Sequence, residues 1–166
     1  MHLMYLLSIA AAAKSIHLSM AYFAPDGVAL ETLLEALRRG VKVQILLPGP
    51  HTDAALVQHA SRAKWGALLK NGAEIHLYQP TMFHCKVLVV DGVWTSVGST
   101  NFDNRSFRLN DEANLNVYDA EVAARQVALF YDDMKKSRRV TYEEWEARPW
   151  REKLREWAAS LLNAQL

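Results

Sequence analysis

The sequence lacks the features that would assign it to a specialised class of protein. It contains one cysteine, Cys85, which excludes an intrachain disulfide and a cysteine metal cluster and favours a reducing compartment. Its 19 Lys and Arg nearly balance its 18 Asp and Glu, so no strong uniform field steers it onto nucleic acid. With 51% hydrophobic and 22% charged residues, it is a globular chain, neither disordered nor fibrous.

Long hydrophobic runs are also missing. The apolar stretch from Leu3 to Ala13 is too short to span a bilayer, and it lacks the positively charged start of a signal peptide. We therefore interpret this stretch as a buried first helix. We expect a cytoplasmic protein that at most contacts the inner membrane peripherally.

Apolar segments alternate between helical and extended patterns, which is typical of an α/β domain, and 166 residues suffice for one main core. We expect helices at about 3–14, 26–40, 52–72 and 120–136, strands at 15–23, 41–47 and 73–78, and three extended runs between 83 and 119. Asp26 is the expected cap of the second helix, and Thr52 or Asp53 that of the third. The predicted fold is α/β, with a mixed β-sheet flanked by helices.

The C-terminal end of the chain has a different pattern. Residues 141–144 read as a capping box, and an apolar stripe at helical spacing follows, formed by Trp150, Leu154, Trp157 and Leu161. We therefore divide the chain into a main lobe at 1–137 and a helical extension at 138–166, packed on the lobe or on a partner. Basic residues flank the stripe, so contact with a membrane surface is the alternative.

The segment from Met82 to Asn101 carries the candidate chemistry. Lys86 begins a β-branched apolar run, and side chains alternate across a strand. His84 and Lys86 therefore share one face, while Cys85 points to the other, where we expect a small buried hydrophobe rather than a nucleophile. The pattern favours a His-Lys pair over a His-Cys metal pair.

Two further groups of residues follow the His-Lys pair. Asp91 and the glycine after it form a strong hairpin signal, so we assign Asp91 a structural role. Beyond the returning strand, Gly98 permits a close backbone approach, and Ser99 and Asn101 offer a hydroxyl and an amide to phosphate oxygens. Glu112 lies on the polar face of the third extended run, where a carboxylate beside His84 would fix its tautomer.

These residues supply an imidazole for attack on phosphorus or for proton transfer, an ammonium and neutral donors for anionic oxygens, and an orienting carboxylate. This chemistry requires no metal and no other cofactor. His84 through Asn101 fit the pattern H-x-K-x4-D-x6-G-S-x-N, with Glu112 as a downstream glutamate, and the chain thereby resembles the phospholipase D superfamily. Similarity to the C-terminal half of bacterial cardiolipin synthases extends over segments 21–26, 39–43, 103–107, 109–114 and 141–149.

The resemblance implies one lobe of the phospholipase D α/β sandwich and a phosphodiesterase or phosphatidyltransferase acting on phospholipid. One histidine would form a phosphohistidine intermediate, and a second would protonate the leaving group and then activate water or an alcohol. His84 is the nucleophile or the acid/base, Lys86, Ser99 and Asn101 bind phosphate, and Glu112 orients His84. Water, glycerol and phosphatidylglycerol would use the same histidine pair, so the acceptor stays open.

The sequence contains one such motif, whereas the implied reaction needs two. We therefore expect a second copy in a homodimer, or an N-terminal half, to complete the site. One alternative function is a homodimeric nuclease that cleaves nucleic acid phosphodiesters with the same residues. Another is a non-catalytic fragment or interaction domain that retains half a site.

Overall fold

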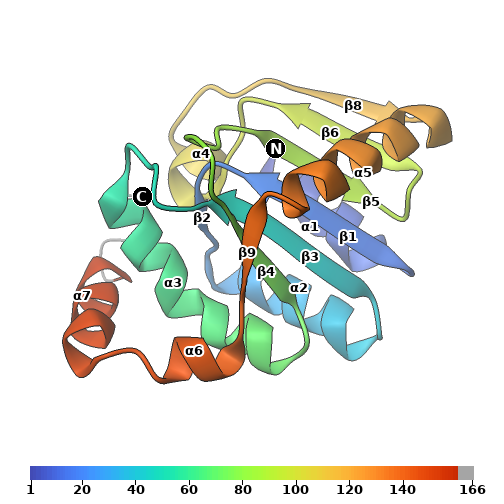
Figure 1. Ribbon diagram of the computed structural model, residues 1–166. Coiled ribbons are helices and arrows are strands. Elements are labelled where there is room, and N and C mark those ends of the chain that lie inside the picture. The colour runs from blue at the N-terminus through green and yellow to red at the C-terminus, as the bar shows by residue number, and fades with distance from the viewer. Residues whose placement is uncertain (161–166) are drawn as a thin grey trace.

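The computed structural model describes residues 1–160, and a seven-stranded sheet forms its middle layer (Figure 1). The sheet consists of β1 (Ser15–Met20), β3 (Lys42–Pro48), β4 (Glu74–Tyr78), β5 (Lys86–Val90), β6 (Trp94–Gly98), β8 (Asn114–Tyr118) and β9 (Ser137–Val140). Its strand order is β8-β6-β5-β1-β3-β4-β9. The pairs β1–β3 and β3–β4 are parallel and the others antiparallel. The predicted mixed sheet is confirmed.

Helices cover both faces of this sheet (Figure 1). They are α1 (His2–Ala11), α2 (Gly27–Arg38), α3 (Ala55–Lys70), α4 (Asn104–Arg108), α5 (Ala120–Met134), α6 (Tyr142–Glu146) and α7 (Trp150–Ser160). A separate two-stranded sheet pairs β2 (Phe23–Ala24) with β7 (Phe102–Asp103). Within residues 1–160, no helix combines the length and the hydropathy that a membrane span requires.

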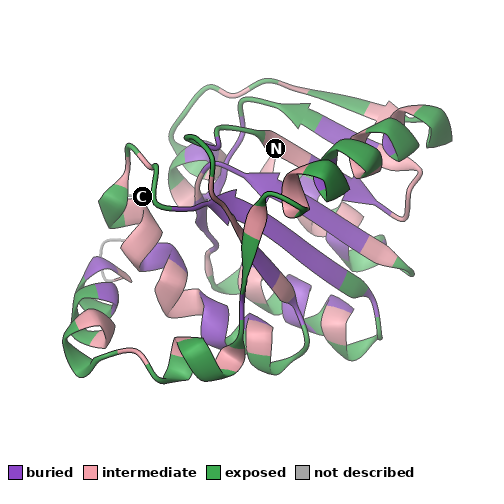
Figure 2. Cartoon of the chain, viewed as in Figure 1, coloured by how far each residue is buried: buried purple, intermediate pink, exposed green. Residues whose placement is uncertain are grey.

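The main core lies between the sheet and the helices α1, α2 and α3. Ile16, Leu18 and Met20 of β1 are fully buried there, because alternate residues of a strand face the same side. His17 and Ser19 face the opposite side, where they line a small cavity with residues of α5. The strands are therefore buried on both faces, as Figure 2 shows for the centre of the sheet.

The two long helices that follow the first strands begin differently. The side chain of Asp26 accepts a hydrogen bond from the Ala29 N–H at 2.8 Å and caps α2 as predicted. α3 begins after Ala54, which provides no side-chain cap, so the predicted cap at Thr52 or Asp53 is wrong. The Asp53 carboxylate instead accepts a hydrogen bond from the Tyr22 hydroxyl at 2.8 Å.

The C-terminal end of the chain joins the sheet before it becomes helical. β9 pairs with β4, so the expected boundary at residue 137 falls inside a strand of the main sheet. The predicted capping box is present at the start of α6. α7 packs on α3 through a face that buries Glu156 and Ala159.

The predicted apolar stripe of α7 lies on the opposite face of that helix. Trp150 is 68% exposed, Leu154 52% and Trp157 58%, so these side chains do not pack on the lobe. Leu161, the fourth member of the stripe, lies outside the described residues. The buried positions instead hold an ion pair, because Glu156 contacts Arg148 at 2.7 Å with both side chains almost fully buried.

Candidate active site

One end of the sheet collects the residues of the predicted motif. β5 is antiparallel to both β1 and β6, so the start of β5 lies beside the ends of these two strands. β8 begins at the same end, with Asn114 opposite Gly98. The topology therefore brings residues that precede β5, follow β6 and precede β8 to one end of the molecule.

His84 and Lys86 both lie against Tyr22 at this end. β5 begins at Lys86, so His84 stands in the segment before the strand rather than in it. The His84 and Tyr22 rings meet edge to face with centroids 5.9 Å apart, and the Lys86 ammonium lies 5.9 Å from the Tyr22 centroid. Lys86 Nζ also donates to the His84 carbonyl oxygen at 3.4 Å. His84 is exposed, so a ligand can reach the imidazole.

The ammonium of Lys86 has several acidic groups around it but no direct partner among them. Burial lowers the pKa of Lys86, and the charges of Cys85, Glu112, Asp53 and Asp103 counteract part of that shift. Within residues 1–160, Lys86 forms no ion pair with a carboxylate. Its donors are therefore available to an anionic ligand.

Cys85 differs from the prediction in its exposure. The residue is exposed, so the expectation of a buried hydrophobe is wrong. Its side chain lines a cavity of about 140 Å³ beneath α5, together with His17 and Ser19, on the side of the sheet that faces away from Tyr22. This cavity partly desolvates the sulfur, and burial raises the pKa of the Cys85 thiol. A raised pKa makes the thiol a poor nucleophile.

Gly98 and Ser99 hold the end of β6 against the residue that precedes β8. A Cβ at Gly98 would collide with the carbonyl oxygen of Ala113, so this close approach requires glycine. The Ser99 N–H donates to the same carbonyl oxygen at 3.0 Å, and the Ser99 hydroxyl accepts from the Ala113 N–H at 3.0 Å. The Ser99 hydroxyl is exposed and donates to the Ala113 carbonyl oxygen at 3.4 Å, a long hydrogen bond that it can exchange for one to a ligand.

Asn101 is buried behind these residues. Its amide nitrogen donates to the Ser106 hydroxyl at 3.4 Å, whereas its amide oxygen is buried with no hydrogen-bond partner among the described residues. A carbonyl oxygen accepts hydrogen bonds and repels phosphate oxygens, so a phosphate contact requires the amide to turn over. In the present orientation Asn101 offers an acceptor to a hydroxyl or an ammonium.

Glu112 belongs to a hydrogen-bond chain that also contains Ser106. It accepts from the Ser106 hydroxyl at 2.9 Å and from the Asn110 amide at 3.2 Å. Burial raises the pKa of Glu112, but hydrogen bonds from Ser99, Asn110 and Ser106 and the charge of Lys86 outweigh it and lower the pKa overall. In this structure Glu112 therefore bonds the loop around the site rather than His84.

Sequence reasoning did not select Tyr22, Asp53 or Asp103 as site residues. The hydrogen bond to Asp53 and burial together raise the pKa of Tyr22 to about 12, burial being the larger cause. Burial also raises the pKa of Asp103 to about 6, although the carboxylate accepts from the Ser106 N–H at 2.8 Å and caps α4. Tyr22 and Asp53 lie in the connections that follow β1 and β3, and Asp103 is the last residue of β7. These positions were the available signal, because side chains at strand ends often form sites.

Asp91 lies at the other end of β5. Its carboxylate accepts hydrogen bonds from the backbone N–H groups of Ala13, Lys14 and Ser15 at 2.8, 2.7 and 2.9 Å. Asp91 itself has φ 54°, a turn conformation that Asp tolerates better than most residues. These hydrogen bonds fix the β5–β6 hairpin to the connection between α1 and β1. Asp91 therefore lies at the end of β5 that is remote from His84.

The structure thus places His84, Lys86, Gly98, Ser99, Asn101 and Glu112 at one end of the sheet. Within residues 1–160, no group of three or more His, Cys, Asp or Glu side chains is arranged to hold a metal ion. The site instead combines an exposed imidazole, an ammonium without a carboxylate partner and a surface hydroxyl. Such groups suit the binding of a phosphodiester and the transfer of its phosphoryl group.

A family model described as "Cardiolipin synthase, PLD-like domain" matches residues 5–134. The chain belongs to the phospholipase D-like family. Relatives of this phospholipase D-like chain include the major cardiolipin synthase ClsA of Bacillus subtilis, which is 39% identical over 159 residues, 96% of this chain and 33% of the relative. The cardiolipin synthase of Geobacillus kaustophilus is 35% identical over 163 residues, 98% of this chain and 32% of the relative. The chain spans about a third of the length of these curated relatives.

Solved structures share the fold of this phospholipase D-like chain. The phospholipase D family member Nuc of Salmonella typhimurium superposes with a TM-score of 0.73 at 24% identity, covering 84% of this chain and 90% of Nuc. The phosphatidylserine synthase of Haemophilus influenzae superposes with a TM-score of 0.76 at 16% identity, covering 97% of this chain and 43% of that chain. The predicted fold of one phospholipase D lobe is therefore confirmed.

Proposed function

We propose that this chain supplies one half of an active site for phosphatidyl transfer or phosphodiester hydrolysis on a phospholipid. The observation that carries this proposal is the exposed imidazole of His84 beside the ammonium of Lys86, which has no carboxylate partner among residues 1–160. The family's curated relatives are cardiolipin synthases. Lys86 and the Ser99 hydroxyl bind the phosphate oxygens, and Asn101 joins them if its amide turns over.

His84 acts in one of two roles in this proposal. As nucleophile, a nitrogen of the imidazole attacks phosphorus, the P–O bond to the leaving alcohol breaks, and a second histidine protonates the leaving oxygen. That second histidine then takes a proton from water or an alcohol, whose oxygen attacks phosphorus and releases His84. As acid/base, His84 performs the proton transfers for a nucleophilic histidine on the other half. Neither role consumes a cofactor.

We propose that Glu112 orients His84 in the completed site. Its present hydrogen bonds are the arrangement before the second half and the substrate bind. It accepts from Ser106 and Asn110 and lowers the electrostatic cost of the nearby Lys86 ammonium. A carboxylate whose partners are side chains can exchange one of them for an imidazole N–H when the second half and substrate arrive. Asp91 and Gly98 support this site without entering it.

A second lobe must complete the active site. The chain spans a third of its curated relatives, which leaves room in a longer polypeptide for another motif. In contrast, this chain covers 90% of the length of Nuc. We therefore propose either a C-terminal half of a longer enzyme or a homodimer, since two-fold dimers place identical residues opposite each other.

The same residues would cleave nucleic acid phosphodiesters in the alternative function, a homodimeric nuclease. One favouring observation is that this chain covers 90% of the length of Nuc, whose fold it shares. The cardiolipin synthase relatives at 35% to 39% identity outweigh it. An inactive fragment or interaction domain is the remaining alternative.

A peripheral membrane contact would bring this site to its lipid. Trp150, Leu154 and Trp157 form an exposed apolar stripe on α7, with Arg151 at its edge. Tryptophan and basic residues together favour the interface of a bilayer. We propose a cytoplasmic protein that touches the inner membrane through this face of α7.

Sedimentation combined with a subunit-mixing assay tests the proposed function. A homodimer should convert phosphatidylglycerol and lose at least about a thousandfold of that activity in His84→Ala, with His59→Ala on α3 as the matched control. Mixing equal amounts of wild type and His84→Ala should leave about a quarter of the activity if both subunits form each site, and about half if each works alone.

Other results decide between the alternatives. DNA cleavage with no lipid turnover would favour the nuclease. A monomer that remains inactive after addition of a separately expressed second lobe would support the non-catalytic reading and contradict the proposal.

A further inference from the structure

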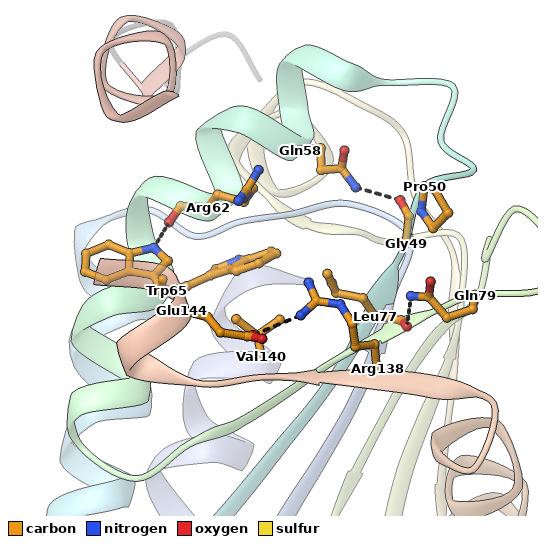
Figure 3. Close-up of a pocket in the computed structure, with 11 residues that line it drawn as sticks. Gly49, Pro50, Gln58, Arg62, Trp65, Leu77, Gln79, Arg138, Val140 and Glu144 are labelled. Carbon is orange, nitrogen blue, oxygen red and sulfur yellow. Dashed lines mark hydrogen bonds and ion pairs between the residues drawn. The ribbon is translucent and has the colours of Figure 1, made fainter. Parts of the chain in front are cut away.

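The cavity drawn in Figure 3 has its charged and polar groups paired within the protein. It has a volume of about 540 Å³ and lies between α3, α6 and the strands β4 and β9. Arg62 contacts Glu152 at 3.6 Å and Glu156 at 3.3 Å, and Arg138 contacts Glu144 at 2.9 Å. The nitrogens of its two carboxamides donate to backbone carbonyl oxygens. These groups therefore give no indication of a ligand.

The cavity beneath α5 differs, because it is lined by a residue with a buried polar atom that has no partner. This cavity has a volume of about 140 Å³ and lies on the face of the sheet that α5 covers. His17 and Ser19 of β1 line it and are 6% and 8% exposed. Among residues 1–160, Nδ1 of His17 has no hydrogen-bond partner. Since a buried polar atom is costly without a partner, Nδ1 indicates where a ligand binds.

The hydrogen bonds around His17 determine which of its nitrogens carries the proton. The Gln44 nitrogen donates to the Glu74 carboxylate at 2.6 Å, so the Gln44 oxygen accepts from the Tyr131 hydroxyl at 3.0 Å. The Tyr131 oxygen has no second hydrogen and therefore accepts from Nε2 of His17 at 3.4 Å. Burial lowers the pKa of His17 and favours the neutral ring. Nδ1 is thus an acceptor, and a ligand must supply the donor.

The other walls of the cavity are mainly apolar. They consist of Phe83, Val87, Val89, Leu129 and Phe130, with Cys85, Gln126 and Asp133 as further polar members. Asp133 also contacts Lys136 at 3.7 Å, which balances its charge. Buried water needs about two to four polar partners, and waters beside these apolar side chains would have few. A dry cavity of about 150 Å³ can hold one benzene molecule, so the volume and the two phenylalanine rings suit a single aromatic ring.

We propose that this cavity binds a small aromatic molecule that carries one hydrogen-bond donor, with phenol as the simplest example. The ligand hydroxyl donates to Nδ1 of His17, and the ring packs against Phe83 and Phe130. Cys85 and Leu129 are exposed, so the cavity opens to solvent beside them. The site is separate from His84, because the cavity faces away from Tyr22, and it requires no second lobe.

Long-range ¹H–¹⁵N NMR of the histidine rings in the full chain tests the proposed contact. Adding phenol should move the Nδ1 signal of His17 upfield in a saturable way at about millimolar concentration, because Nδ1 accepts a hydrogen bond. Toluene has the ring without the donor and should move this signal much less. His76 is also buried but does not line the cavity, so its signals are the control and should stay in place.

Cys85 provides an independent measurement of affinity. It is the one cysteine of the sequence, and it lines the cavity. A bound ligand should therefore slow the alkylation of Cys85 by iodoacetamide. The dependence of this rate on the concentration of phenol or toluene gives the dissociation constant for each protein variant.

Two variants separate the hydrogen bond from the space. His17→Leu removes the acceptor and keeps an apolar side chain beneath α5, so the ratio of phenol affinity to toluene affinity should fall at least about fivefold. Val87→Phe, at a half-buried position in the wall, fills the cavity and should abolish binding of both ligands. Val117→Phe makes the same change at a half-buried position of β8 outside the cavity and should retain binding.

Four results would overturn the proposal. A phenol titration without a saturable shift would mean that the cavity holds water alone. Equal shifts with phenol and toluene, or an unchanged affinity ratio in His17→Leu, would mean that Nδ1 does not bind the donor. Binding that survived Val87→Phe would place the ligand elsewhere. If His17→Leu failed to fold, the comparison of phenol with toluene on the unaltered protein would still decide.

Discussion

The two ends of the sheet use their carboxylates differently. At one end, Asp91 accepts three hydrogen bonds from backbone N–H groups. At the other, Glu112 accepts from the side chains of Ser106 and Asn110, near the ammonium of Lys86. Backbone bonds fix the path of the chain, whereas side-chain bonds can be exchanged for a ligand. One end therefore stabilises the lobe, and the other provides groups for chemistry.

Lys86→Met should produce the largest effect at the catalytic end. Loss of the ammonium that offsets phosphate charge should lower activity by about a hundredfold or more, while the unfolding free energy changes by less than about 1 kcal/mol. The assay uses the assembly that completes the site, and urea unfolding gives the stability. Lys135→Met, at an exposed ion pair on the surface, is the control and should retain activity. Full activity of Lys86→Met would remove Lys86 from the site.

Asp91→Ala should have the reverse profile. It removes the acceptor for three backbone N–H groups, so the unfolding free energy should fall by about 3 kcal/mol. Because the contacts lie far from His84, the folded fraction should keep its specific activity. Asp91→Asn retains an acceptor and should restore part of the stability. A stable Asp91→Ala variant with impaired turnover would contradict the division between the two ends.

The sequence was a good guide wherever local pattern decides structure. Alternation of side chains placed Cys85 on the face opposite Lys86, because parity along an extended segment is a local property. His84, in contrast, precedes the strand that was expected to contain it. The same reasoning missed the exposure of Cys85, since exposure depends on how closely α5 covers the strand. It also missed β9, whose residues Arg138 and Arg139 are polar and exposed, because only pairing with β4 makes them a strand.

The candidate site was predictable in its residues and not in its contacts. The motif selected His84 and Lys86, whose spacing is fixed in the sequence. Tyr22 and Asp53 are separated from that motif, and folding alone brings Tyr22 against His84. Sequence reasoning expected Asp53 to cap a helix, but α3 begins only after Ala54, and Asp53 instead accepts from the Tyr22 hydroxyl.

Asp103 lies beside Glu112, and Asp103→Asn should have a smaller effect that depends on pH. The affected quantity is the free energy of unfolding. The pKa of Asp103 is raised from 3.8 to about 6 in the folded protein, so folding binds its proton. This stabilisation is complete below the unfolded pKa and is lost as the pH rises through about 6, by an amount on the order of 2 kcal/mol. Asn cannot ionise but still accepts from the Ser106 N–H. Urea unfolding of wild type and variant should therefore be compared from pH 4 to pH 7.5. The difference between their unfolding free energies should change with pH below pH 7 and be constant above it. A difference that stayed constant over the whole range would contradict the assignment.

Tyr22→Phe should have the smallest effect, because it removes one hydroxyl and keeps the ring beside His84 and Lys86. Loss of the 2.8 Å hydrogen bond to Asp53 frees the loop before α3 and should lower kcat about fivefold, with KM nearly unchanged. Tyr22→Leu removes the ring as well, so it should lower kcat further and also raise KM as the Lys86 ammonium loses its aromatic support. Steady-state kinetics on the two variants separates the hydroxyl from the ring. If both variants lost the same activity, the ring would contribute nothing, and the packing of His84 and Lys86 against Tyr22 would not matter for catalysis.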